Sequence, residues 1–128
     1  YRRALGRDPN HVPSLNNLAV ALADFGNDPE EFEKLIERAR SLAPNEPTIE
    51  ESYGWVLLRM GKVKKALAIL KTASMTLRND GGAQYHLGVA LIAAGKLKEG
   101  HAALKTAASL GVPEHYKLKI AKILGNSN

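Results

Sequence analysis

The chain of 128 residues contains no cysteine, and aromatic residues make up only 5% of it. The absence of cysteine excludes disulfide bonds, thiolate metal sites and a cysteine nucleophile. No apolar run approaches the roughly 18 residues that a membrane-spanning helix needs. The sequence therefore predicts no direct membrane insertion.

The sequence also lacks an initiator methionine and a secretory signal peptide. Because Tyr1 falls within what reads as the middle of a helix, we expect the chain to be a segment of a longer protein. The cytoplasm and the periplasm both stay open as locations, since a chain without cysteine is compatible with either redox state.

Positive charge is unevenly distributed. The net charge is +5. Residues 1–64 hold 9 Lys/Arg and 10 Asp/Glu, whereas residues 65–128 hold 9 Lys/Arg and only 3 Asp/Glu. A basic half attracts nucleic acid, anionic surfaces or acidic proteins, but binding to single-stranded nucleic acid ordinarily also uses stacking aromatics or Arg. Tyr116 is the only aromatic residue among the lysines from Lys96 to Lys122. The composition therefore favours a solvated helix surface and predicts no nucleic-acid partner. Binding of an anionic surface or nucleic acid through the basic C-terminal half is kept as the less favoured alternative function.

The most informative feature present is an internal repeat of 34 residues. Leu70-Lys71-Thr72-Ala73 recurs as Leu104-Lys105-Thr106-Ala107, and Gly54 and Gly61 recur as Gly88 and Gly95. The period extends backwards, with a slip of one residue between Gly26 and Phe32. A fixed period of this length indicates stacked units of supersecondary structure.

Each period divides into two amphipathic helices. The apolar spacing predicts helices over residues 13–25, 47–60, 63–78, 82–94, 97–110 and 114–124, and one from Pro29, capped by Asp28, that ends before Pro44. Small residues recur at one position of each first helix and one of each second helix: Ala19, Gly54, Gly88, Ala39, Ala73 and Ala107. We expect them to let paired helices approach closely.

These patterns predict an all-α fold of antiparallel helix-turn-helix repeats in a single domain. We divide it into the tail of a preceding repeat (1–9), three repeats (12–45, 46–79 and 80–112) and a C-terminal capping helix with a tail (113–128). The cap is expected to turn Leu118, Ala121 and Leu124 towards the stack.

The third unit reads Gln84-x2-Leu87-Gly88-x2-Leu91, then Gly100-x3-Leu104 and Ala107. This resembles the tetratricopeptide-repeat (TPR) family, whose unit reads Trp-x2-Leu-Gly-x2-Tyr, then Ala-x3-Phe, Ala and Pro. The large opening aromatic is missing from all three units, Arg78 stands where the final Pro is expected, and Gly100 replaces Ala. The resemblance implies a right-handed α-solenoid, and the style of the repeats is similar to bacterial members.

The resemblance also implies a non-enzymatic scaffold whose first helices line a concave groove that binds a peptide or helical segment of unknown identity. Carried over by register, the predicted protein-binding residues are Asn16, Asn17, Val20, Glu51, Trp55, Leu58, Arg59, Tyr85, Val89 and Ile92. The same register places Asp24, Ser52 and His86 in the groove. No basic cluster lies there, so a clamp for a C-terminal carboxylate is not expected.

Two interpretations of Trp55 stay open. It forms an exposed apolar patch with Leu58, Val89 and Ile92 that receives an apolar or amphipathic segment, or it packs as core. Likewise, Asn16 and Asn17 either bond to the backbone of that segment or simply provide surface polarity.

No pattern predicts catalysis, a cofactor or a metal site. None of the four histidines, His11, His86, His101 and His115, lies three or four residues from another, so no helix presents a two-histidine metal face. The sequence has no nucleophile elbow of the G-x-S-x-G type and no phosphate-binding loop. Self-association through an unpaired repeat end stays open as the alternative to a partner protein.

Overall fold

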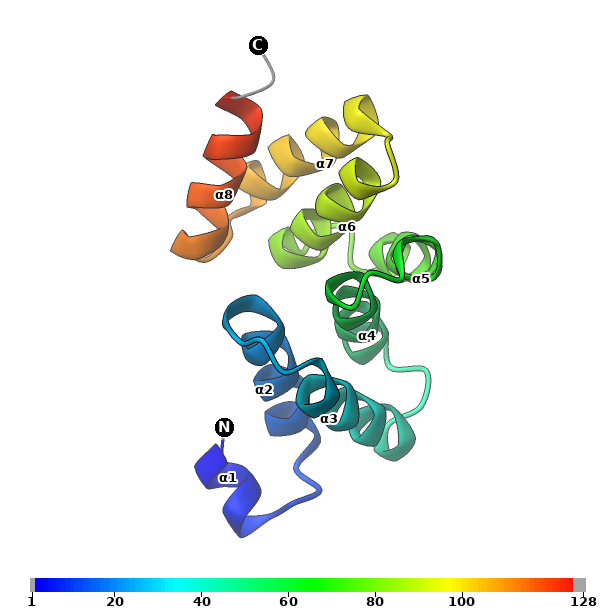
Figure 1. Cartoon of the computed structure of the whole chain (residues 1–128), viewed down its shortest axis with the longest axis vertical. Helices are drawn as coiled ribbons and strands as arrows, with labels where there is room; N and C mark the ends of the chain where they lie inside the picture. The colour runs from blue at the N-terminus through cyan, green and yellow to red at the C-terminus, as the bar shows by residue number, and fades with distance from the viewer. Residues whose placement is uncertain (1, 126–128) are drawn as a thin grey trace.

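The computed structural model describes residues 2–125, which form eight helices and no strands. In chain order they are α1 (Arg2–Arg7), α2 (Val12–Phe25), α3 (Pro29–Leu42), α4 (Pro47–Arg59), α5 (Val63–Thr76), α6 (Gly81–Ala93), α7 (Leu97–Leu110) and α8 (Glu114–Gly125) (Figure 1). The predicted all-α fold is confirmed, and the predicted helix ends agree with these bounds to within two residues.

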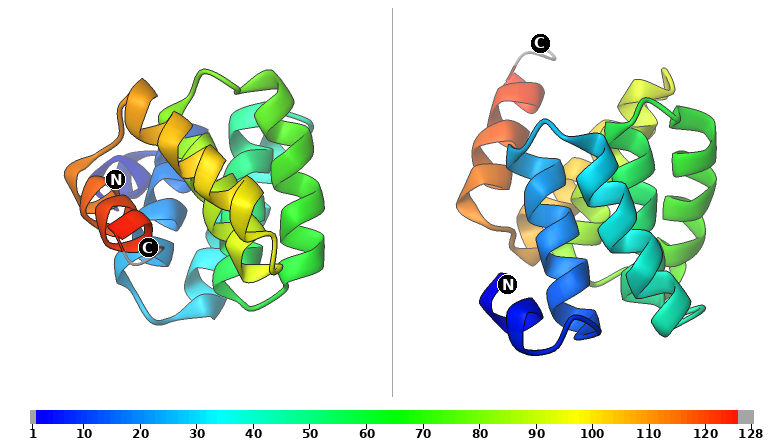
Figure 2. Two further views of the ribbon diagram at one scale, coloured as in Figure 1. Left: turned by 90° about the horizontal axis from the view of Figure 1, so that it is seen from above. Right: turned by 60° about the horizontal axis from the view of Figure 1, so that its bottom comes forward.

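The helices stack as three antiparallel pairs, α2 with α3, α4 with α5, and α6 with α7. Each second helix also contacts the first helix of the following pair, and α2 contacts α4 as α4 contacts α6. Figure 2 shows the same succession from two further directions, with α1 and α8 on the same side of the stack. This connectivity is that of a helical solenoid, in which each unit packs mainly on its neighbours.

Small residues set the spacing within the pairs, as the sequence predicts. A Cβ atom at Gly54 would lie 2.8 Å from Leu70 Cγ, and one at Gly88 would lie 2.8 Å from Leu104 Cδ2. Both leucines are fully buried. The third pair therefore repeats, 34 residues later, the packing of the second.

The turns within these two pairs are also equivalent. Gly61 and Gly95 have φ angles of +84° and +83°, a left-handed conformation that favours glycine. After each glycine the next amide donates back into the preceding helix, from Lys62 N to Leu57 O at 3.0 Å and from Lys96 N to Leu91 O at 2.8 Å. These bonds satisfy helix-end carbonyls, as in the Schellman motif.

The start of α3 follows the capping expectation. The backbone N–H of Glu31 donates to Asp28 Oδ1 at 3.3 Å, with Pro29 in the first turn. The missing repeat-ending proline at Arg78 does not prevent a turn between α5 and α6, because Asp80 N donates to Leu77 O at 2.9 Å. Asp80 then caps α6 by accepting from Ala83 N at 3.1 Å.

Gly100, where the family pattern has alanine, lies at a close approach of α6 and α7. A Cβ atom there would lie 2.5 Å from Ile92 Cγ1 and 3.0 Å from the carbonyl oxygen of Gly88. The departure from the pattern therefore matches a neighbour that leaves no room for a methyl group.

Replacing Gly100 with alanine is expected to lower the free energy of unfolding by about 1 kcal/mol or more. Overpacking costs about 1–3 kcal/mol, and the higher helix propensity of alanine offsets at most about 1 kcal/mol of it. Urea denaturation followed by far-ultraviolet circular dichroism measures the change. Gly6→Ala is the control, because nothing lies within 4 Å of a Cβ at Gly6; equal stability of both variants would show that Ile92 moves without cost.

The rotation of α8 differs from the predicted one. Tyr116 and Ile120 are its buried residues, whereas Leu118 is 64% exposed and Ala121 is also exposed. The predicted inward face was thus wrong at Leu118 and Ala121, and Leu124 is only half-buried. Tyr116 determines the rotation, since its ring stacks on Tyr85 of α6 with centroids 4.0 Å apart.

Candidate functional site

A cavity of about 520 Å³ lies between α2, α4, α6 and α8. Its volume is within the range of about 300–1,000 Å³ that is usual for ligand pockets. Helix α8 and the turn before it supply one wall. The lining residues are Asn16, Asn17, Val20, Ala21, Asp24, Phe25, Thr48, Glu51, Ser52, Asp80, Gly81, Gly82, His86, Gly111, Pro113, His115 and Tyr116.

The cavity brings together four of the predicted site residues: Asn16, Asn17, Val20 and Glu51. Asn16 and Glu51 are buried, Val20 is half-buried and Asn17 is exposed. These four residues, predicted by their register in the repeat, thus lie together at one hollow of the structure.

The other six predicted residues do not line this cavity. Trp55 and Tyr85 are 2% exposed and Leu58 is 9% exposed, so the exposed apolar patch predicted around Trp55 was wrong and its alternative, core packing, is confirmed. Val89 and Ile92 are half-buried, and Arg59 is exposed with its Nε donating to Ala23 O at 3.0 Å.

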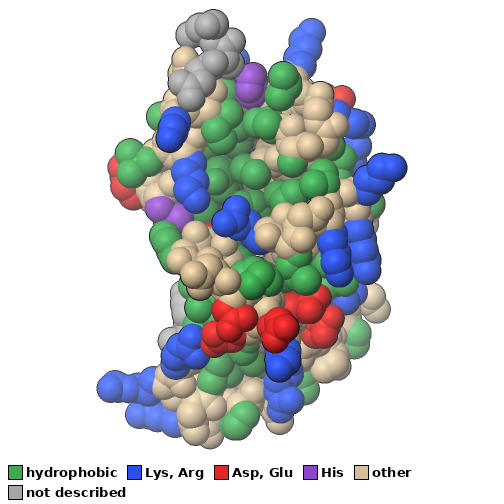
Figure 3. All heavy atoms as spheres, in the orientation of Figure 1, with side chains coloured by type: hydrophobic (Ala, Val, Ile, Leu, Met, Phe, Trp, Pro, Cys, Tyr) green, Lys and Arg blue, Asp and Glu red, His purple; other side chains and the backbone are tan. Residues whose placement is uncertain are grey.

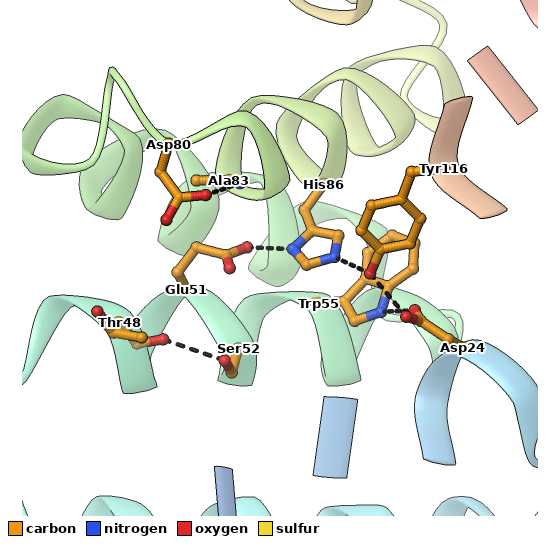
Figure 4. Close-up of polar contacts among 9 residues, drawn as sticks. All are labelled: Asp24, Thr48, Glu51, Ser52, Trp55, Asp80, Ala83, His86 and Tyr116. Atoms are coloured by element: carbon orange, nitrogen blue, oxygen red, sulfur yellow. Dashed lines mark hydrogen bonds and ion pairs between the residues drawn. The ribbon is translucent and has the colours of Figure 1, made fainter. Parts of the chain in front are cut away.

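Trp55 is buried against a hydrogen-bonded network in the cavity wall (Figure 4). Its Nε1–H donates to Asp24 Oδ1 at 2.9 Å, and its ring stacks on His86 with centroids 4.1 Å apart. The Tyr116 hydroxyl donates to Asp24 Oδ2 at 2.7 Å, and His115 Nε2 lies 3.1 Å from the same oxygen. Asp24, with a side chain only 5% exposed, thus joins α2 to both α4 and α8.

His86 extends this network to a second carboxylate. Its Nε2 lies 2.8 Å from the Tyr116 hydroxyl oxygen, and its Nδ1 lies 2.5 Å from Glu51 Oε2. Because the Tyr116 proton is donated to Asp24, the hydroxyl oxygen accepts from His86 Nε2–H. A single proton then lies between His86 Nδ1 and Glu51, and an unbroken buried chain runs from Asp24 to Glu51.

The two stacked tyrosines are held in the neutral form. Burial raises the pKa of Tyr85 to about 12, and the nearby Asp24 carboxylate contributes to the increase. Burial also raises the pKa of Tyr116, and so does the hydrogen bond that its hydroxyl donates to Asp24. Tyr116 therefore acts in the network as a hydrogen-bond donor at neutral pH.

This arrangement predicts a loss of stability in alkali that depends on Tyr85. A tyrosine whose pKa is higher in the folded chain stabilises it fully below about pH 10 and loses that contribution as the pH rises towards 12. The stability difference between the wild type and Tyr85→Phe is expected to be constant near neutral pH and to fall by about 1 kcal/mol per pH unit above about pH 10.

Urea denaturation of both proteins at a series of pH values measures this difference. The phenylalanine variant removes the titrating hydroxyl and keeps the ring stacked on Tyr116. Parallel stability curves up to pH 12 would contradict the pKa of about 12 for Tyr85.

Of the residues in the hydrogen-bonded network, Tyr116 and His115 are the two that the sequence analysis did not predict for the site. The register places Asp24 and His86 in the groove, but the bond from Tyr116 to Asp24 spans 92 positions. No period or local motif signals a contact between residues so far apart. The tyrosine among the lysines of the last helix was the available signal, since a buried Tyr usually finds a partner for its hydroxyl.

Within residues 2–125 the structure has no group of three or more His, Asp or Glu side chains arranged to hold a metal ion. None of the helices in this range is long and apolar enough to cross a membrane. On the face that Figure 3 shows, acidic side chains form a band across the lower middle, and basic side chains gather along the edge beside α5.

Comparison with known proteins gives matches among repeat proteins. Residues 30–107 match the family model described as anaphase-promoting complex, cyclosome, subunit 3. A TPR repeat-containing protein of Pseudomonas aeruginosa is 36% identical over 72 residues, which are 56% of this chain and 12% of that protein. The chain thus spans only a small part of this relative.

Three solved structures illustrate the same arrangement of helices. A thermophilic TPR protein of Thermus thermophilus has a TM-score of 0.69 and 21% identity, over 96% of this chain and 69% of that one. MamA of Desulfovibrio magneticus RS-1 has a TM-score of 0.65 and 24% identity, over 95% of this chain and 69% of that one. PilW, a type IV pilus biogenesis factor, has a TM-score of 0.65 and 25% identity, over 98% of this chain and 60% of that one. These likenesses confirm the predicted solenoid of helical repeats.

Proposed function

This chain belongs to the tetratricopeptide-repeat family, through its match to the family of subunit 3 of the anaphase-promoting complex, and we propose that its concave cavity holds a segment of a partner protein. The TPR fold is in general a scaffold for protein–protein interaction. Solenoids of this kind bind partners on their concave surfaces. The cavity between α2, α4, α6 and α8 is the hollow of that surface in this chain.

One side chain carries the proposal. Asn16 Oδ1 is buried in the cavity wall and has no hydrogen-bond partner among residues 2–125, while its Nδ2 donates to Asn17 Oδ1 at 3.4 Å. A buried acceptor without a donor costs about 1–3 kcal/mol. A donor N–H group on an inserted segment would remove that cost.

The chemistry of the walls favours an extended, polar segment. The apolar residues expected to receive a helix, Trp55 and Leu58, are buried in the core. Thr48 and Ser52 line the cavity instead, beside Asn16 and Asn17. An extended segment therefore fits these walls better than the predicted apolar or amphipathic one.

We propose binding and not catalysis as the role of this site. Asp24, Tyr116, His86 and Glu51 hydrogen bond to one another. Their arrangement is that of a network that fixes α8 to the concave side.

The test compares obstruction of the concave and the convex side. Asn17→Phe adds a ring to the cavity wall, and Thr72→Phe adds the same ring to a hollow on α5 outside the cavity. In affinity capture from the organism of origin, a partner is expected to be retained by the wild type and Thr72→Phe and lost, by about tenfold or more, with Asn17→Phe.

Equal capture by both variants would place the binding surface elsewhere. Capture of nothing but copies of the bait would favour self-association, the second candidate. Self-association would cover apolar side chains that the single chain exposes, such as Phe25, which is 72% exposed, and Met75, which is 77% exposed.

A further inference from the structure

The cavity wall carries acidic side chains and no Lys or Arg. Asp24, Glu51 and Asp80 line it, although the whole chain has a net charge of +5. His86 and His115 also line it, and each contacts one of these carboxylates. A hollow whose charged groups are mainly carboxylates focuses a negative electrostatic potential. The wall therefore favours a cationic occupant and disfavours a carboxylate.

The three carboxylates differ in the number of hydrogen-bond donors that already contact them. Asp24 accepts hydrogen bonds from Trp55, Tyr116 and His115. Glu51 uses Oε2 for His86, and within residues 2–125 no donor contacts its Oε1. Glu51 lines the cavity and is 7% exposed, and Asp80, which also lines it, is exposed.

The amide side chain of Asn16 is a further unsatisfied group in the cavity wall, separate from the carboxylates. Asn16 is 7% exposed, and its Oδ1 is the buried side-chain acceptor that meets no donor in the described part of the chain. Asn16 and Glu51 are each the fifth residue of their helices, α2 and α4, which pack side by side. Two acceptors that meet no donor within residues 2–125 thus lie at equivalent positions on adjacent helices that line one cavity.

We propose that the partner segment inserts a lysine or arginine side chain into this cavity, with its cationic end hydrogen bonded to Asn16 Oδ1 and Glu51 Oε1. An ammonium or guanidinium group has only donors, which matches two acceptors that lack them. The carboxylate adds charge to the hydrogen bond and so strengthens it. This inference rests on the proposed function, because it specifies the chemistry of the segment that the cavity holds.

Trp55 provides a reporter for the experiment. It is the only tryptophan of the chain, and it stacks on His86, which bonds to Glu51. Pools of short capped peptides, randomised except at a central lysine, acetyl-lysine, norleucine or glutamate, are titrated against its fluorescence. The lysine pool is expected to bind about tenfold or more tightly than each of the others, and less tightly as salt is added.

The variants separate a cationic site from general binding. Glu51→Gln is expected to abolish the preference for lysine, whereas Glu99→Gln, an exposed change of the same kind on α7, leaves it intact. Because Glu51 also bonds to His86, Asn16→Ala is a second variant outside that pair, and it too is expected to weaken the lysine pool selectively. Circular dichroism checks that each variant is folded.

If norleucine peptides bind as tightly as lysine peptides and Asn17→Phe abolishes both, the cationic inference is overturned and the proposed function stands. If no pool responds to Asn17→Phe, both are overturned. If n-butylammonium alone binds as tightly as the lysine pool, the cavity is a site for free amines, and the assignment to a protein segment is overturned.

Discussion

The Tyr116→Ala variant is expected to unfold with a free energy about 3–5 kcal/mol lower than that of the wild type. The ring is 4% exposed and stacks on Tyr85 with centroids 4.0 Å apart. Its removal leaves a cavity and also deprives Asp24 and His86 of a hydrogen-bond partner. Both costs fall on the contact that holds α8 against α2 and α6.

Losses of this size are a large part of the roughly 5–15 kcal/mol that stabilises an ordinary domain. A thermal midpoint lower by roughly 10 °C or more follows, and differential scanning calorimetry measures it. Tyr116→Phe keeps the ring and loses the hydroxyl, for which about 1–3 kcal/mol is expected. Lys117→Ala, an exposed change one residue along, serves as the control; if Tyr116→Ala matched it, the contacts of the Tyr116 side chain would contribute nothing to stability.

The second large effect is expected at Gly81, the first residue of α6. A Cβ atom there would lie 2.0 Å from the carbonyl oxygen of Gly111 and 3.0 Å from Val112 Cγ1. The obstacle is backbone, which cannot rotate away as a side chain can, so the start of α6 or the turn before α8 must move. Gly81→Ala is therefore expected to cost about 2–3 kcal/mol, the upper part of the range for overpacking.

The change at Gly81 is also expected to alter the environment of Trp55. A shift of the turn before α8 moves Tyr116 and His115, which share Asp24 with the tryptophan. Gly82→Ala is the matched control, because a Cβ there meets only Asp80 Oδ1, at 3.2 Å. Urea denaturation and Trp55 emission would refute the expectation if the two alanine variants behaved alike.

The helices and turns of this chain could be predicted because their signals are local and recur. Gly61 and Gly95 adopt the left-handed conformation that ends a helix, and Asp28 caps α3 as its position before Pro29 indicates. A period of 34 residues then multiplies every such signal. The boundaries of the individual repeats, at 12–45, 46–79 and 80–112, remain a prediction.

The site could be predicted only in part, and Trp55 shows why. Helical geometry puts it on a different side of α4 from Tyr53 and Leu57, which are buried as well. What covers it on the other side is Asp24, His86 and Tyr116, from three other helices. Periodicity gives the direction of a side chain, whereas its burial depends on side chains that the fold brings from distant parts of the sequence.

The prediction of how α8 is rotated was wrong for the same reason. An isolated amphipathic helix is assigned its inner face from its own apolar residues, which pointed to Leu118 and Ala121. In the structure Tyr116 meets a buried carboxylate on α2, and this contact outweighs the exposure of Leu118.

The bonds from α8 to Asp24 join residues 91 and 92 positions apart. In most repeat arrays each repeat contacts only its nearest neighbours, so the two ends unfold and refold largely independently of each other. Here the first and last thirds of the chain share a carboxylate, and closing so long a loop has an entropic cost that grows only with the logarithm of its length. The folding of this array is therefore expected to be cooperative from end to end, so that local unfolding at one terminus destabilises the helix at the other.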